Sequence, residues 1–252
     1  GGTITQTSTS IVSFIFKKSG TQIYTASGNT VTGNIDYTVN SASILDVGTS
    51  LVLGRNFTLA SGGGMLIGSP DGISSSGLTG NIQVSGTRSF NTVADYTFSG
   101  VDPQITGNGL PATIRNLTVN NSSDVSLTNT VTATGILTFT SGLINTGSNE
   151  LKVTNTSTSS IVGYTSSKYV NGNLRRSVSG SGSYFFPVGT ALNYELANVN
   201  LSTTAGVSNI LVQFIDSTPL IPSLPLTNIN VQGLATDSLL NYGFWRLTPN
   251  SA

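Results

Sequence analysis

The chain has 252 residues, of which only 8% are charged, and its ten basic and ten acidic side chains cancel at neutral pH. It contains neither cysteine nor histidine, which excludes disulfides, thiolate or imidazole metal sites and His-dependent catalytic triads. Because its basic residues form no large cluster, counterion release would drive nucleic-acid binding only weakly, and no such partner is expected. No apolar run approaches the roughly 20 residues that span a bilayer, so no membrane-spanning segment is predicted.

The first apolar run, residues 11–16 (IVSFIF), has the length of a strand or an end cap and is followed by Lys17 and Lys18. Lysines beside an apolar edge strand discourage association between sheet edges, although two solvated lysines in a turn would look the same. Short apolar alternations follow at residues 35–39, 51–53, 57–59 and 65–67, separated by turns rich in glycine, asparagine and serine. This pattern of short apolar alternations between turns predicts many short strands and leaves no room for helices.

The clearest pattern lies in residues 114–154, where apolar residues alternate with polar ones between turns. A period of two places these apolar side chains on one face of each strand. Leu117 and Leu137 lie one plausible coil of a parallel β-helix apart, and we expect Thr118 and Thr138 to point outward. The residues predicted to share one core are Leu117, Val119, Val125, Leu127, Leu137, Phe139, Leu151 and Val153.

Longer alternating strands begin near Tyr184 and are joined by a proline-rich connection, which is typical of an antiparallel sandwich. The predicted fold is therefore all-β: a parallel β-helix (β-solenoid) over residues 1–189, followed by an antiparallel β-sandwich-like domain over residues 190–252, either whole or truncated. We expect Trp245, the only tryptophan, to anchor the core of that domain with Phe214 and Phe244 as neighbours.

Carboxylates are the remaining route to catalysis, because a glycosidase needs two of them across a cleft. Asp95 and Asp102 could converge, but each lies beside a turn, where aspartate commonly caps the backbone. We therefore predict no catalytic residue. The only local cluster that could bind calcium combines Asp71, Asp95 and Asp102 with Arg88 nearby, so no cofactor is predicted apart from this calcium alternative.

Pairs of threonines separated by one residue could form flat rows of hydroxyl and methyl groups on one side of a solenoid. Ice-binding solenoids use such rows, but threonine also favours strands and supplies polar surface where charges are scarce. The pairs are Thr128/Thr130, Thr132/Thr134 and Thr138/Thr140.

Four segments together resemble the large secreted repeat proteins of Bacteroidota, many of which are exported by the type nine secretion system and include gliding-type adhesins. They are residues 106–121 (TGNGLPATIRNLTVNN), 135–149 (GILTFTSGLINTGSN), 169–176 (YVNGNLRR) and 186–189 (FPVG), and the similarity spans most of residues 81–247. The resemblance implies β-helical or β-sandwich stalks that stand outside the outer membrane, with a separate C-terminal sorting domain. Such a domain is not visible here, and the chain starts with Gly-Gly, so we expect a piece of a larger protein.

These observations predict a non-enzymatic stalk or adhesive module of a secreted, extracellular cell-surface protein exported across the outer membrane. The expected partners are extracellular surfaces or glycans, other domains of the larger polypeptide, and secretion or outer-membrane proteins. A solenoid that binds a glycan, ice or another repetitive surface is the alternative, and a polysaccharide-degrading enzyme is a third.

The resemblance also implies O-linked glycans, which bacteria of this group attach to a serine or threonine that follows aspartate and precedes an apolar residue or threonine. Ser217 (in Asp-Ser-Thr) and Ser238 (in Asp-Ser-Leu) fit this rule and lie in expected loops. Ordinary Asp-Ser turns would have the same sequence.

Overall fold

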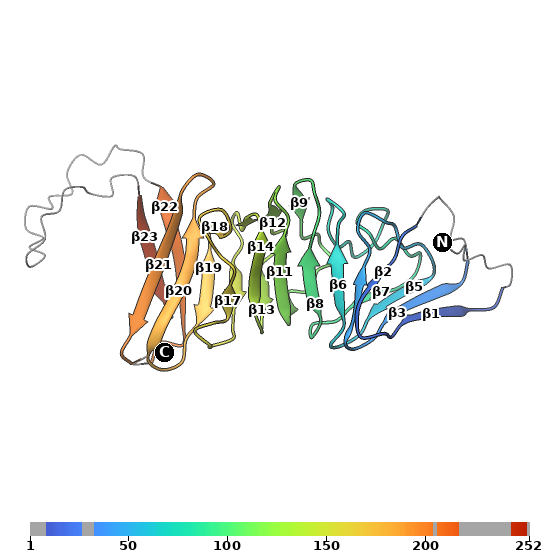
Figure 1. Cartoon of the computed structure of the whole chain (residues 1–252), viewed down its shortest axis with the longest axis horizontal. Coiled ribbons are helices and arrows are strands. Elements are labelled where there is room, and N and C mark those ends of the chain that lie inside the picture. Colours follow the sequence, from blue (N-terminus) through green and yellow to red (C-terminus); the bar gives the residue numbers. More distant parts are fainter. Residues whose placement is uncertain (1–8, 27–32, 204–205, 217–242, 251–252) are drawn as a thin grey trace, which may run out of the picture.

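The computed structural model describes residues 9–26, 33–203, 206–216 and 243–250. In this part of the chain all regular structure is β-strand, and no helix is present that is long and apolar enough to cross a membrane. The strands stack along one long axis, as Figure 1 shows. The predicted β-solenoid is confirmed and has about eight coils. At about 4.8 Å per coil, the solenoid is on the order of 40 Å long.

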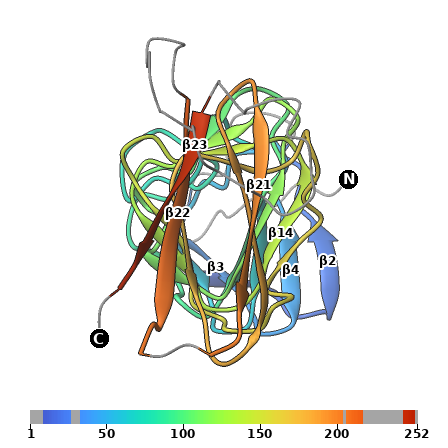
Figure 2. The ribbon, with the colours of Figure 1, turned by 90° about the vertical axis from the view of Figure 1, so that its left-hand side faces the viewer.

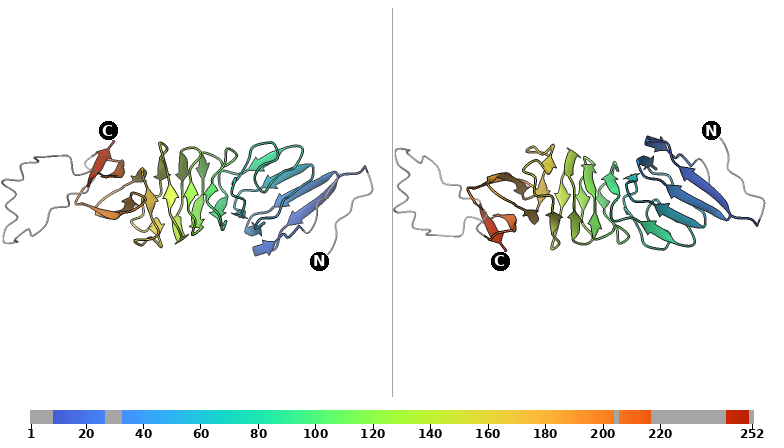
Figure 3. Two further views of the ribbon diagram at one scale, coloured as in Figure 1. Left: turned by 90° about the horizontal axis from the view of Figure 1, so that it is seen from above. Right: turned by 90° about the horizontal axis from the view of Figure 1, so that it is seen from below.

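One parallel sheet contains a strand from each of seven successive coils. Its strands are β2 (Gly20–Ile23), β4 (Ser43–Asp46), β6 (Gly64–Ile67), β8 (Asp95–Phe98), β11 (Asn116–Asn120), β14 (Leu137–Ser141) and β17 (Ile161–Val162). They lie side by side in chain order, so each coil pairs with the coil before it and the coil after it. This seven-stranded sheet forms one side of the solenoid, and the two views in Figure 3 show the coils as successive layers along the rod.

The strand that precedes these in each coil belongs to a four-stranded sheet near the N-terminus or to a six-stranded sheet further along. The four-stranded sheet contains β1 (Val12–Phe16), β3 (Ile35–Val39), β5 (Asn56–Leu59) and β7 (Arg88–Phe90). The six-stranded sheet starts with β10 (Thr113–Ile114), β13 (Val131–Ala133), β16 (Leu151–Val153) and β19 (Leu174–Ser177). From the fourth coil on, a third side is formed by β9 (Gln104–Ile105), β12 (Val125–Ser126), β15 (Ile144–Asn145) and β18 (Val170–Asn171).

The register of the coils agrees with the alternation in the sequence. Leu117 pairs with Leu137 and Val119 with Phe139 in the parallel ladder between β11 and β14, which confirms the predicted coil length. All eight residues predicted to share a core are buried, and they belong to one apolar cluster that runs through the solenoid. Thr118 lies between two of them on the outer surface, as predicted. Each fully buried Leu or Phe contributes about 1.5–3 kcal/mol, so this cluster is the main source of stability.

Glycine is required where the chain turns a corner against the preceding coil. Gly142 has a φ of 72°, and a Cβ atom there would lie 1.8 Å from the carbonyl oxygen of Asn121. A larger residue would therefore be strained by its backbone conformation and would clash with the neighbouring coil. Asparagines also link coils: the Asn171 side chain donates to Asn145 Oδ1 at 2.8 Å.

Antiparallel strands close the C-terminal end of the rod. They are β20 (Gly182–Gly189), β21 (Tyr194–Leu201), β22 (Asn209–Asp216) and β23 (Gly243–Pro249). β20 pairs with the solenoid strand β18 and β22 pairs with β19, so both antiparallel pairs extend sheets of the solenoid. Figure 2 shows β21 on one side of the rod end and β22 with β23 on the other. Phe186 and Phe214 join the continuous core. The antiparallel strands are thus present, but a separate sandwich is not confirmed, and the boundary at residue 189 stays a prediction.

Trp245 does not anchor a core, so that prediction was wrong. The side chains of Trp245 and Phe244 are 38% and 45% exposed, whereas Phe214 is buried. Trp245 packs edge-on against Phe214, with ring centroids 6.0 Å apart, and its indole N–H donates to the Glu195 carbonyl oxygen at 3.2 Å. The reason is its place in the sheet: β23 is the outermost strand, and in the described part of the chain no strand beyond it covers the indole.

The first strand is an edge strand, as the lysines beside it suggested. β1 pairs with β3 on one side only among the described residues, and Ile11, Val12 and Ile15 are each about half exposed. Lys17 and Lys18 follow directly and are exposed. Their role in discouraging edge association stays a prediction.

Candidate functional site

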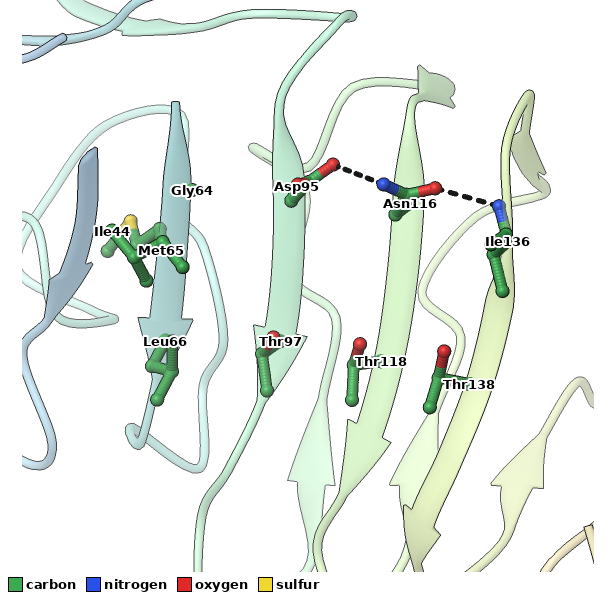
Figure 4. Close-up of a pocket in the computed structure, with 10 residues that line it drawn as sticks. All are labelled: Ile44, Gly64, Met65, Leu66, Asp95, Thr97, Asn116, Thr118, Ile136 and Thr138. Carbon is green, nitrogen blue, oxygen red and sulfur yellow. Dashed lines mark hydrogen bonds between the residues drawn. The ribbon is translucent and has the colours of Figure 1, made fainter. Parts of the chain in front are cut away.

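A shallow groove lies on the outer surface of the seven-stranded sheet, across β4, β6, β8, β11 and β14 (Figure 4). It encloses about 260 Å³. Because outward residues recur at every second position of each strand, the lining consists of two parallel rows that cross the coils. One row is made of a leucine and three threonines, and the other is made of a glycine and a polar pair with an isoleucine at either end.

The threonine row contains Thr97, Thr118 and Thr138, one from each of three successive coils. Thr118 pairs with Thr97 on β8 and with Thr138 on β14, so the three side chains are in register (Figure 4). Strands in a sheet lie about 4.8 Å apart, and the hydroxyls repeat at that spacing. None of the three hydroxyls has a hydrogen-bond partner among the residues that the structure describes.

The second row is held together by hydrogen bonds between coils. The Asn116 amide donates to Asp95 Oδ1 at 2.8 Å, and its oxygen accepts from the Ile136 backbone N–H at 2.7 Å (Figure 4). Arg115 donates to both carboxylate oxygens of Asp95, from Nε and Nη2, each at 2.7 Å. These bonds raise the pKa of the Arg115 guanidinium. The Asp95 charge is therefore paired, and the groove has no unpaired charge.

Gly64 makes the hollow in this row. A Cβ atom at this position would lie 3.1 Å from Ile44 Cγ1 and 3.7 Å from Asp95 Cβ. Any larger residue on β6 would project outward and fill the space. Ile44 and Leu66 line the same end of the groove, and Leu66 pairs with Thr97, so an apolar side chain follows the threonines in their row.

The carboxylates considered for catalysis do not form a free pair. Asp95 begins β8 and is engaged by Arg115, whereas Asp102 lies beyond the other end of β8, exposed in a turn. The Asp102 carbonyl oxygen accepts a hydrogen bond from Asn121 at 2.8 Å, which gives the residue a role in the turn.

The cluster considered for calcium is also used by the fold. Arg88 donates to the carbonyl oxygens of Ser74, Gly77 and Val84, so it holds the loop between β6 and β7 in place. Burial lowers the pKa of its guanidinium. Within the described ranges, no three acidic side chains come together in a way that could hold a metal ion. The calcium alternative stays untested.

The threonine pairs singled out in the sequence do not form rows of their own. They lie in one coil on successive sides of the solenoid, because the chain turns corners between them. Several of their hydroxyls link coils: Thr128 Oγ1 accepts from the Gly107 N–H at 3.0 Å, Thr130 Oγ1 accepts from the Glu150 N–H at 3.1 Å, and Thr134 Oγ1 donates to a carbonyl at 3.1 Å. Only Thr138 belongs to the groove. The threonine row of the groove instead contains one threonine from each of three successive coils.

The sequence contains a signal for the polar row that its alternation alone did not reveal. Asp-Tyr-Thr at residues 95–97 is followed one coil later by Arg-Asn at residues 115–116, and the same order occurs at residues 36–38 and 55–56. In both places the arginine pairs with the aspartate of the preceding coil. A search for opposite charges one coil apart would have found it.

Ser217 and Ser238, the predicted glycosylation sites, lie outside the described residues, so their modification stays a prediction. In comparisons with family models, curated proteins and solved structures, no match to this chain was found.

Proposed function

We propose that this chain is a non-enzymatic stalk or adhesive module of a large secreted cell-surface protein. The observation that carries the proposal is the uninterrupted rod, in which one apolar core runs from Phe16 to Phe214. A rod of stacked coils keeps its two ends a fixed distance apart, which is the task of a stalk. The resemblance to type nine secretion cargo of Bacteroidota supplies the proposed location, outside the outer membrane.

Side-chain contacts between coils support a rod that keeps its shape. Three ion pairs each join one coil to the next, and the arginine comes from the later coil each time. They are Asp36–Arg55, Asp95–Arg115 and Glu150–Arg175. Pairs this exposed add little free energy individually, but they tie the coil register together at three separate levels.

The edge strand β1 supports contact with a further strand. Among the described residues no strand pairs with the outer edge of β1, and the apolar side chains of Ile11, Val12 and Ile15 are 55%, 45% and 50% exposed. An edge of this kind can pair with a further strand, either from the same polypeptide or from a neighbouring domain. Such a strand would cover these side chains.

Two measurements test the proposal. Small-angle X-ray scattering of the purified chain should give an elongated particle that keeps its maximum dimension across protein concentrations. An antibody raised against the chain should label intact cells of the organism that encodes it. A compact particle would contradict the stalk, and labelling that requires cell lysis would contradict the surface location.

A further inference from the structure

The threonine row of the groove is polar surface that the fold does not use. The hydroxyls of Thr128 and Thr134 each form a hydrogen bond to another coil, but those of Thr97, Thr118 and Thr138 form none within the described residues. Three donors and acceptors at regular spacing are therefore free to bind a ligand.

The charges around the groove select against an ionic ligand. Asp95 is the one ionisable residue in the lining, and Arg115 neutralises it through two hydrogen bonds of 2.7 Å. A charged ligand would gain no opposite charge here and would lose part of its hydration. The groove thus fits a ligand without net charge.

The chemistry of the lining matches that of a sugar ring. Leu66 pairs with Thr97, Ile136 lies two residues before Thr138, and Ile44 adds a further apolar side chain at the far end of the groove. A pyranose has C–H groups on its faces and hydroxyls around its edge, so it can contact both kinds of surface at once. The hydroxyl spacing of about 4.8 Å is also close to the length of one sugar unit in an extended chain.

We propose that this groove binds a short stretch of neutral, extended polysaccharide that crosses β8, β11 and β14 along the axis of the rod. Thr97, Thr118 and Thr138 exchange hydrogen bonds with successive sugar hydroxyls, and the hollow at Gly64 receives one ring. This inference rests on the proposed adhesive function and assigns its contact site.

Two other ligands fit the groove less well. A peptide strand binds a sheet through free backbone groups at an edge, whereas the backbone of β8 and β11 is already paired on both sides. An ice surface requires a flat array, and the hollow at Gly64 interrupts the plane. A polysaccharide can follow a concave surface.

Titration calorimetry of the whole chain with soluble oligosaccharides tests the proposal. The probes are cellohexaose, xylohexaose, mannohexaose and chitohexaose, with oligogalacturonate as a charged comparison. We expect at least one neutral hexasaccharide to bind. Thr118→Val keeps the shape and removes one hydroxyl, and should weaken binding about 5- to 10-fold. Gly64→Val fills the hollow and should abolish binding.

Thr132→Val is the matched control. Thr132 lies on β13 in a similar half-buried position, pairs with Thr113 and Lys152, and is not part of the groove. Its replacement should leave binding unchanged, and circular dichroism should confirm that all variants are folded. The proposal is overturned if no neutral probe binds at millimolar concentration, if oligogalacturonate binds best, or if Thr132→Val weakens binding as much as Thr118→Val. None of these results would alter the particle length or cell labelling that test the stalk.

Discussion

Replacement of Arg176 by methionine should be among the most damaging single changes in this protein. Arg176 is on β19, its side chain is 0% exposed, and burial lowers the pKa of its guanidinium. The guanidinium donates to the carbonyl oxygens of Phe185, Ser157 and Thr158, each at 2.7 Å, and lies 5.4 Å from the centre of the Tyr184 ring. It thus holds a loop and the strand β20 against the last solenoid coil.

The magnitude follows from the groups that lose their partner. A fully buried carbonyl without its hydrogen-bond donor costs about 1–3 kcal/mol, and Arg176 serves three part-buried carbonyls, each of which should cost less than a fully buried one. Methionine keeps the apolar stem and relieves the desolvation of a buried charge, which offsets part of this loss. We expect the free energy of unfolding to fall by about 3 kcal/mol.

The neighbouring residue provides the control. Arg175→Met removes an arginine from the same strand, but this side chain is partly exposed and pairs with Glu150. Arg175→Met should lower the free energy of unfolding by at most about 1 kcal/mol, because solvent screens such ion pairs. Urea denaturation followed by circular dichroism gives both values. A free energy of unfolding for Arg176→Met within about 0.5 kcal/mol of the wild type, or no lower than that of Arg175→Met, would contradict this role of Arg176.

Three further outcomes are expected. Leu137→Asp buries an unpaired charge at a 0% exposed position and should lower the melting temperature sharply. Thr138→Asp, on the outer surface, should change the melting temperature little. Equal shifts for the two variants would contradict the inward and outward assignment. Gly142→Ala should lower the free energy of unfolding, measured by chemical denaturation, by at least about 2 kcal/mol. The reason is that φ is 72° and the new Cβ would lie 1.8 Å from a carbonyl oxygen. An unchanged free energy of unfolding would contradict this backbone conformation. The hydrogen bond from Arg175 lowers the pKa of Glu150 below its ordinary 4.5, so the pair adds stability above that pH and loses it as pH falls through the folded value. Glu150→Gln should therefore reduce the acid dependence of the melting temperature slightly, and an increased dependence would reverse the assigned sign.

The sequence alone determined the class of fold and the orientation of its core. Alternation with a period of two is a local property, so it placed Leu117 and Leu137 inward and Thr118 outward without knowledge of any partner strand. It also identified the antiparallel strands near the C-terminus, because their greater length is visible in the chain itself. The lack of histidine and cysteine excluded disulfides and the metal or catalytic sites that need these residues, because this conclusion depends on composition alone and not on where residues lie in the fold.

Only the tertiary structure decided which coils meet and what their contacts form. Coil length varies: Leu117 pairs with Leu137, but the loop before β7 makes Met65 pair with the more distant Tyr96. When the spacing is irregular, the sequence cannot say which polar residues will be neighbours, so the groove at Gly64 was not predicted. The exposure of Trp245 was missed for a related reason. Whether an aromatic strand is buried depends on what packs beyond it, and this is decided by the order of strands in the sheet and not by the strand's own residues.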